Sequence, residues 1–438
     1  MKKIFRFGLI FAAFSIFFGC TKNEGLDMKK NSYNLIINGY DWGPAADKLI
    51  LSTEKSIKKS ALNVSDFSVV VKTEVWDWSV MPPRTKTGAG NREILKAYLC
   101  SQDGTELTAE EESEFIALEM SVHPENPFSN PFFYGSDMMN HWQKIYDVTV
   151  KNEKLQININ QENRKISPLA DQFKMGKSTT DSITLNYGFW KPENSGDKIP
   201  LIIWLHGMGE GGTDPYIALL GNKVVNLITD EVQKSFGSEG AFVLVPQVDG
   251  FWMQTKLGST NFETWVSDSN PLVVSCYTKA LFNLIDNFVK SNPEIDKDRI
   301  YIGGCSNGGY MTINMLLEYP DYFAAAYPVC QAYPDSKITE EKLNILKNQN
   351  IWFTQALTDK TVNPENYTIP TYERLCAAGA KNVHLSLWDN VEDLTGQFFG
   401  KNGETYEYNG HFSWIYTLNN QCAENGVQIF KWLSDQKK

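Results

Sequence analysis

Three features are scarce or missing in this sequence of 438 residues. Basic residues are outnumbered, since 41 Lys and Arg against 52 Asp and Glu give a formal net charge of −11. The chain therefore lacks the basic footprint of nonspecific nucleic-acid binding. No interior stretch reaches the roughly 18 uninterrupted apolar residues of a membrane-spanning helix, which excludes a polytopic membrane protein. The seven cysteines form no C-x-x-C pair and no zinc-binding spacing, so we predict neither a metal site nor a cofactor.

Apolar residues, in contrast, are plentiful. Hydrophobic residues make up 42% of the chain and aromatic residues 13%, which is enough for a sizeable core and excludes global disorder. The length predicts two domains, or one large domain with an extension.

The N-terminus has the pattern of an export signal. Residues 1–19 combine a positively charged start with an apolar run over 7–18, and a Gly stands directly before Cys20. This pattern resembles a bacterial lipoprotein signal, which implies cleavage before Cys20 and a lipid on that residue. The alternative is an ordinary signal peptide with a coincidental Cys. Residues 20–32 are polar and are interpreted as a tether, which places the protein in the bacterial cell envelope, periplasmic or on the cell surface.

Residues 33–165 have the pattern of a small all-β domain. Turn-rich stretches separate short runs, several of them alternating or β-branched, at 33–38, 67–75, 94–99, 114–122 and 145–150. Strands with this spacing are typical of a β-sandwich. About 130 residues are too few for a propeller of several four-stranded blades.

Residues 166–438 change to alternating strands and helices. Apolar strand-like runs occur at 201–205, 241–245, 299–302, 324–329, 351–353 and 383–387, and helical patterns at 273–289, 307–317, 367–378 and 425–433. This alternation predicts a doubly wound, mostly parallel α/β sheet that is covered on both faces. Ligand chemistry then belongs at the carboxyl ends of the strands.

The most informative segment is 299–311, RIYIGGCSNGGYM. It contains a G-x-S-x-G motif, from Gly304 to Gly308, between a predicted strand and a predicted helix. A nucleophile at such a sharp turn needs a strained backbone, and the flanking glycines let the strand and the helix approach each other. We therefore predict that Ser306 is a nucleophile, with a plain Gly-rich turn as the alternative.

A second Gly-rich turn follows an earlier predicted strand, in IIWLHGMGEGG at 202–212. Backbone N–H groups in such a turn, and directly after the nucleophile, stabilise the oxyanion of a tetrahedral intermediate. We expect the N–H groups of Asn307 and Met208 to form this oxyanion hole, with Gly209 as the alternative second donor. His206 is expected to be structural and to pack beneath the loop.

The nucleophile needs a general base, and the chain has five histidines. His123 and His141 lie in the β region, and His384 begins a predicted strand, at the wrong end for the site. His411 lies in a loop before the last helix and is the predicted base.

The base in turn needs an acidic partner that fixes its tautomer. Asp359 follows the strand-like run at 351–353 after a short turn and is the favoured acid. Asp389 and Asp393, after the next strand, are its competitors.

These residues carry a resemblance. Residues from about 182 to 438 resemble the α/β-hydrolase superfamily in LHGMGEGG, RIYIGGCSNGGYM, TDKTV and YNGHFSW, and look closest to exported esterases related to feruloyl esterases and polyhydroxybutyrate depolymerases. The order Ser306, Asp359, His411 is that of an α/β-hydrolase. The preceding β domain resembles the immunoglobulin-like domain of some esterases. The chain departs from the usual pattern in having Cys305 before the serine and an insertion at 389–408.

The resemblance implies a serine hydrolase that cleaves carboxylic esters of an acylated extracellular substrate, with feruloyl or acetyl esters of plant polysaccharide as the leading expectation. Trp252 and Trp414 are the better candidates to bind substrate, ahead of Phe251 and Trp265, and core packing is the alternative for each. Two other functions compete: a prolyl-oligopeptidase-like serine peptidase, and a noncatalytic surface lipoprotein that binds glycans.

The lipid anchor gives a first prediction. Cys20→Ser should move the protein from the membrane fraction to the soluble fraction, because the substitution removes the residue that carries the lipid. Fractionation of cells followed by immunoblotting measures this. Unchanged membrane association of the variant would contradict the lipoprotein hypothesis.

Overall fold

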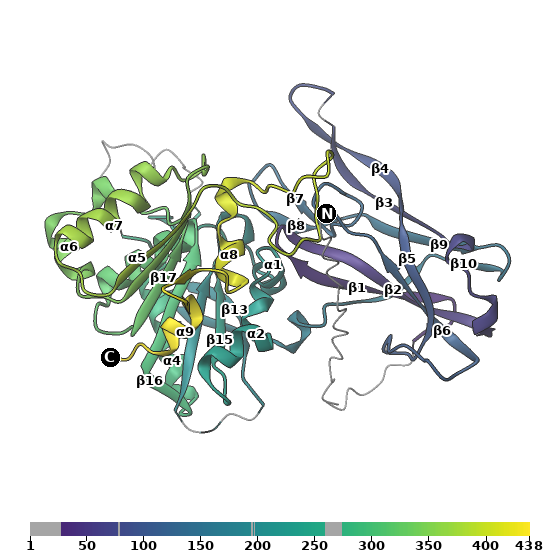
Figure 1. The fold of residues 1–438 in the computed structure, drawn as a ribbon, viewed down its shortest axis with the longest axis horizontal. Coiled ribbons are helices and arrows are strands. Elements are labelled where there is room, and N and C mark those ends of the chain that lie inside the picture. Colours follow the sequence, from purple (N-terminus) through teal and green to yellow (C-terminus); the bar gives the residue numbers. More distant parts are fainter. Residues whose placement is uncertain (1–27, 78, 194–195, 197, 259–273) are drawn as a thin grey trace, which may run out of the picture.

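The structure is a computed structural model, and it describes residues 28–77, 79–193, 196, 198–258 and 274–438. Two bodies lie side by side, an N-terminal β-sandwich and a C-terminal α/β unit (Figure 1). The predicted signal peptide at 1–19, most of the predicted tether at 20–32, and Cys20 and Trp265 lie outside the described residues. In the described ranges no helix is long and apolar enough to cross a membrane.

The sandwich consists of two sheets. Along their strands, residues that face the core alternate with residues that face solvent. A five-stranded sheet has the order β11-β1-β2-β6-β5 and a four-stranded sheet the order β10-β9-β3-β4. Strand β9, Tyr146–Asn152, buries every second residue, as expected for a strand with one face on a core. The other strands are β1 (Ser32–Tyr40), β2 (Gly43–Lys58), β3 (Ser68–Asp77), β4 (Arg84–Arg92), β5 (Ile94–Cys100), β6 (Glu112–Met120), β10 (Ile157–Ile159) and β11 (Gln161–Ile166). A separate hairpin pairs β7 (Phe132–Tyr134) with β8 (Asn140–Trp142).

The C-terminal unit is built on an eight-stranded sheet of order β12-β13-β15-β14-β16-β17-β18-β19. The pairs β12–β13 and β13–β15 are antiparallel, and the strands from β15 to β19 run parallel. Strands β14, β15, β17 and β18 are buried along their whole length, because helices cover both faces. The bounds are β12 (Lys174–Thr180), β13 (Ile183–Trp190), β14 (Ile199–Leu205), β15 (Phe242–Gln247), β16 (Ile295–Cys305), β17 (Ala325–Val329), β18 (Ile351–Ala356) and β19 (Val383–Trp388).

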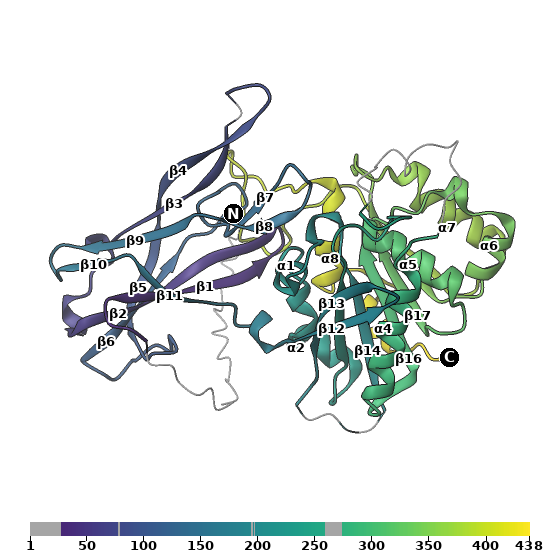
Figure 2. The ribbon, with the colours of Figure 1, turned by 180° about the vertical axis from the view of Figure 1, so that it is seen from behind.

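Helices cover the sheet as two layers (Figures 1 and 2). The helices α4 (Thr278–Ser291), α5 (Asn307–Glu318), α6 (Glu340–Leu346) and α7 (Thr368–Ala377) contribute to one apolar cluster. The helices α1 (Pro215–Leu220), α2 (Asp230–Gln233), α8 (Trp414–Leu418) and α9 (Ile429–Ser434) contribute to another. The second cluster also includes core residues of the sandwich, so apolar packing continues from one body into the other.

The insertion at 389–408 packs on the sandwich. The ring of Phe398 lies edge-on to that of Trp42, with ring centroids 4.7 Å apart. His123 Nε2 lies 3.1 Å from the carbonyl oxygen of Phe399. The insertion therefore bridges the two bodies shortly before the loop that holds His411.

The structure corrects several predicted elements. Strand β2 was not predicted, and β4 occupies much of the turn-rich stretch expected between the runs at 67–75 and 94–99. Strand β4 pairs with β3 along its full length, but at the sheet's edge it is mostly exposed and carries no apolar pattern. Helix α9 begins only at Ile429, after a small β20–β21 hairpin of Ala423–Glu424 and Val427–Gln428. Helix α4 begins at Thr278 rather than 273.

Candidate active site

Ser306 stands in a strained turn between β16 and α5. Its backbone has φ 55° and ψ −112°, a conformation that L-residues rarely adopt. A Cβ atom on Gly308 would lie 2.0 Å from the carbonyl oxygen of Leu205, and one on Gly304 2.4 Å from the same atom. Both motif glycines are therefore required for β14, β16 and α5 to meet this closely, and the half-buried Ser306 lies at the carboxyl edge of the sheet.

His411 and Asp359 form a buried pair at the same edge. His411 Nδ1 lies 2.8 Å from Asp359 Oδ2. The His411 side chain is 11% exposed and the Asp359 side chain 0%. Because a carboxylate only accepts hydrogen bonds, Nδ1 carries the proton, and Nε2 is left to act as a base.

The carboxylate of Asp359 is held by three further donors. Its Oδ1 accepts from the backbone N–H groups of Thr361, at 2.8 Å, and Val362, at 2.9 Å. Its Oδ2 accepts from Gln355 Nε2 at 2.9 Å, besides the bond from His411. These bonds fix the carboxylate at the carboxyl end of β18, so it can orient an imidazole ring.

The loop that carries His411 lies directly on the loop that carries Asp359. A Cβ on Gly410 would lie 2.5 Å from the carbonyl carbon of Thr358. Asn409 caps the short η9 turn (Gly410–Phe412) by accepting from the backbone N–H of His411 at 3.0 Å. A side chain at position 410 would push the loop of His411 away from that of Asp359.

The competing acids have other environments. Asp393 is buried, and its carboxylate accepts from the side chain and backbone N–H of Thr395 and from the backbone N–H groups of Gln397 and Phe398. Burial tends to raise the pKa of Asp393, but these hydrogen bonds outweigh it and lower the pKa. Asp393 therefore organises the insertion, while Asp389 is exposed.

Both expected oxyanion donors stand at the starts of helical turns. Asn307 is the first residue of α5, and Met208 is the first residue of the short η4 turn, Met208–Glu210. N–H groups in these positions have no partner within their own helix. A Cβ on Gly207 would lie 3.3 Å from Cys305 Sγ, so the turn that begins at Met208 lies close to the residue before Ser306.

His206 lies beneath the loop, as expected for a structural residue. It is fully buried, Val248 N donates to its Nε2 at 3.2 Å, and its Nδ1 lies 2.6 Å from the carbonyl oxygen of Gly207. Burial lowers the pKa of His206 to about 4. The ring is therefore neutral at physiological pH, and Nδ1–H donates to Gly207.

The tryptophan predictions need correction. Trp252 is 0% exposed and offers no surface to a substrate. Its ring lies 5.1 Å from that of His206, and its backbone N–H donates to Asn307 Oδ1 at 2.6 Å, so it supports the start of α5. Trp414 is 6% exposed, and its ring lies edge-on to His411 at 5.7 Å. The apolar patterning could not separate core tryptophans from binding ones.

Two buried residues at the site were not predicted. The Sγ of Cys330 lies within 4.8 Å of a carboxylate oxygen of Asp359 and of a ring nitrogen of His411. Burial raises the pKa of the Cys330 thiol well above its usual value, so it stays protonated and does not favour a metal. Glu210 is 5% exposed, in the same turn as Met208. A lone acid inside the Gly-rich MGEGG turn was the only sequence signal for it.

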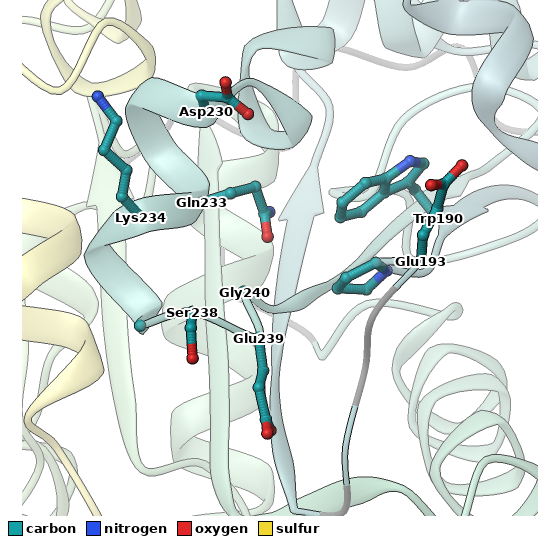
Figure 3. Close-up of a pocket in the computed structure, with 10 residues that line it drawn as sticks. Trp190, Glu193, Asp230, Gln233, Lys234, Ser238, Glu239 and Gly240 are labelled. Carbon is teal, nitrogen blue, oxygen red and sulfur yellow. The ribbon is translucent and has the colours of Figure 1, made fainter. Parts of the chain in front are cut away.

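A pocket of about 380 Å³ lies away from these residues. Its walls include Trp190, Gln233 and Glu239 (Figure 3). Trp190 pairs with Val243 near the start of β15, so the pocket is at the opposite edge of the sheet from Ser306. The Gln233 amide is engaged with Leu227 O and Ala241 N, and none of the predicted site residues lines the pocket.

The buried carboxyl of Glu210 makes stability depend on pH. Burial raises the pKa of Glu210 from 4.5 to about 7, so the folded protein holds this proton more tightly than the unfolded chain. The stability from this group is present below pH 4.5 and is lost as the pH rises to about 7, by about 3 kcal/mol. The free energy of unfolding of Glu210→Gln, compared with that of wild type, should therefore be higher at roughly pH 8 than at roughly pH 5. Urea unfolding at both pH values measures this difference. An equal difference at both pH values would contradict this.

Two protein families match parts of the chain. The family described as the esterase Ig-like N-terminal domain matches residues 32–165, which form the sandwich. The prolyl oligopeptidase family matches residues 278–382, a range that includes the turn at Ser306 and Asp359.

Solved structures and characterised proteins are also similar. The crystal structure of a thermostable esterase matches with a TM-score of 0.71 at 25% identity, over 93% of this chain and 100% of that one. A ferulic acid esterase matches with a TM-score of 0.41 at 16% identity, over 60% of this chain and 97% of that one. Poly(3-hydroxyalkanoate) depolymerase C of Paucimonas lemoignei is 46% identical over 46 residues, which are 10% of this chain and 11% of the depolymerase.

The likeness to the depolymerase is thus confined to a short segment, whereas that to the thermostable esterase extends through both bodies. The predicted fold class, an α/β-hydrolase sheet behind an immunoglobulin-like sandwich, is confirmed. The sandwich belongs to the family of esterase Ig-like N-terminal domains, and the whole chain shares its two-domain fold with a thermostable esterase.

Proposed function

We propose that the protein is a serine esterase that hydrolyses carboxylic esters through an acyl-enzyme. Ser306 is the nucleophile, His411 the general base and Asp359 its orienting acid. The observation that carries this proposal is the 2.8 Å bond between His411 Nδ1 and Asp359, made at the same sheet edge as the strained Ser306.

The reaction begins when Ser306 Oγ attacks the acyl carbonyl carbon and His411 Nε2 takes the hydroxyl proton. Asp359 stabilises the imidazolium that forms. The N–H groups of Met208 and Asn307 stabilise the negative charge on the carbonyl oxygen.

Collapse of this tetrahedral intermediate breaks the ester C–O bond. His411 gives its proton to the departing alcohol, and the acyl group remains on Ser306. A water molecule then attacks the acyl-enzyme, with His411 again as base, and releases the carboxylic acid.

We further propose that the substrate is an acylated carbohydrate, such as a feruloyl or acetyl ester of plant polysaccharide, reached from a bacterial cell envelope to which Cys20 anchors the protein. The support is the sequence resemblance to feruloyl esterases and the signal pattern that ends at Cys20. Neither metal nor cofactor has a part in this mechanism, because the base and the oxyanion donors are groups of the protein.

A second candidate function is a serine peptidase on the same scaffold, favoured by the match of residues 278–382 to the prolyl oligopeptidase family. The sandwich favours the esterase, because it matches a family described as an N-terminal domain of esterases. A noncatalytic role in glycan binding would not require the hydrogen-bonded pair of Asp359 and His411.

Ser306→Ala should abolish turnover of aryl, acetyl and feruloyl esters while the fold is kept, because the covalent path is lost. Rates on this panel and on peptide amides measure it, with circular dichroism as the control for folding. Labelling by a fluorophosphonate should also disappear in the variant. Turnover of amides alone would favour the peptidase, and full ester turnover by the folded variant would refute the mechanism.

Asp359→Asn should lower kcat by roughly 10³–10⁴, because the imidazole then loses its orienting carboxylate. Asp389→Asn is the matched control: it makes the same change at an exposed competitor and should leave kcat near the wild-type value. Steady-state kinetics on an aryl ester measure both variants. A large effect at Asp389 with none at Asp359 would reverse the assignment of the acid.

A further inference from the structure

The Ig-like domain contacts the loop that follows β14. We define residues 207–212 as the oxyanion loop. The hairpin β7–β8 lies against it: a Cβ on Gly209 would be 3.2 Å from Asn140 Nδ2 and 3.5 Å from Tyr134 Cε2. A Cβ on Gly211 would be 3.2 Å from Met139 Sδ. The loop therefore packs closely against side chains of the hairpin, while the carbonyl oxygen of Gly250, 2.2 Å from a Cβ on Gly211, limits it on another side.

A hydrogen bond joins the hairpin to the loop. Asn140 Nδ2 donates to Glu210 Oε1 at 3.2 Å. The carboxylate of Glu210 also accepts from the backbone of Gly207, so one buried side chain connects the start of the loop with the other domain. Bonds to a charged acceptor in a buried place are stronger than those between neutral groups.

The far end of the loop is tied to the same hairpin. Trp142 Nε1 donates to Asp214 Oδ2 at 2.8 Å. Asp214 in turn caps α1 by accepting from the backbone N–H of Tyr216 at 3.0 Å. Gln247 Nε2 donates to the carbonyl oxygens of Glu210, at 2.9 Å, and Asp214, at 3.0 Å, from the carboxyl end of β15. These bonds fix both ends of the oxyanion loop. Asn140 contacts the middle of the loop, where Met208 and Glu210 belong to the same turn.

We propose that Asn140 is a positioning residue for ester hydrolysis: through Glu210 it holds the oxyanion loop so that the N–H of Met208 meets the developing oxyanion. The inference rests on the proposed function and extends it, because it makes the Ig-like domain a working part of the active site. Oxyanion stabilisation depends on donors that are in place before reaction, so a small displacement of this turn lowers kcat more than it changes substrate affinity.

Because Asn140 donates and Glu210 accepts, the contact can be tested by exchanging the donor and the acceptor between these two positions. Asn140→Asp replaces the donor with a carboxylate that faces Glu210. Adding Glu210→Gln restores a donor and an acceptor with the roles exchanged, since the Gln amide can donate to Asp at 140 while its oxygen accepts from Gly207. Asn140→Ala removes the donor without adding charge. Ser136→Asp adds the same charge on the exposed turn of the same hairpin and is the control.

At pH 8 the expected result for Asn140→Asp is a kcat about tenfold below wild type, with KM within about twofold. The deficit relative to wild type should shrink as pH falls, because two adjacent carboxyls share a proton that restores the hydrogen bond. The other titratable groups facing Glu210 are Tyr134, Cys305 and Cys330, whose raised pKa values keep them neutral over this range. The double variant should recover to near wild type, Asn140→Ala should also be slow, and Ser136→Asp should be unchanged.

Hydrogen–deuterium exchange separates this inference from the proposed function. Backbone amides of 207–212 should exchange faster in Asn140→Asp and return to the wild-type rate in the double variant. If the wild-type protein hydrolyses no ester but this exchange pattern holds, the proposed function fails and the loop contact stands. A folded Asn140→Asp with wild-type kcat and exchange, or a folded double variant without recovery, would overturn the inference.

Discussion

The candidate active site depends on the close contact between the end of β14 and the turn after β16. At Gly304 and Gly308 the backbones approach so closely that no side chain fits against the carbonyl oxygen of Leu205. This contact aligns the helical turn at Met208 with the start of α5. The strained turn at Ser306 therefore lies against the fully buried strand β14.

The predicted base and acid come from a different part of the chain. Asp359 follows β18, and His411 comes after β19 and a long insertion. Gly410 allows their two loops to lie in contact, and the donors around Asp359 hold its carboxylate still. Ring contacts of Phe398 with Trp42 anchor the insertion to the sandwich. The Ig-like domain thus supports the site on two sides, through the insertion and through the β7–β8 hairpin.

Two buried ionisable residues, His206 and Glu210, hold the loop after β14 through hydrogen bonds. His206 is neutral because burial lowers its pKa, so it serves as a fixed link between Gly207 and Val248. Glu210 keeps a carboxyl in a place where ionisation costs stability, in the same short turn as Met208. Polar groups that reduce stability are commonly found where a protein performs its function.

The sequence alone determined the fold class, and it predicted which residues carry the chemistry. Period-2 and period-3.6 apolar patterns separated the sandwich from the α/β unit, and the G-x-S-x-G motif, flanked by a strand and a helix, indicated the nucleophile. Such signals are local, because each depends on neighbouring residues in one element. Asp359 was favoured by its position after a strand, and its pairing with His411 became visible only in the structure.

Only the tertiary structure decided which polar and aromatic residues serve the site. Trp252 carries the same apolar signal whether it faces a substrate or the core, and the packing of His206 and α5 buries it. Strand β4 exists because β3 pairs with it, although its own residues are exposed and polar. The contact of Asn140 with Glu210 joins residues 70 positions apart, on separate domains. No periodicity encodes such a contact, because it depends on how two independently patterned bodies pack together.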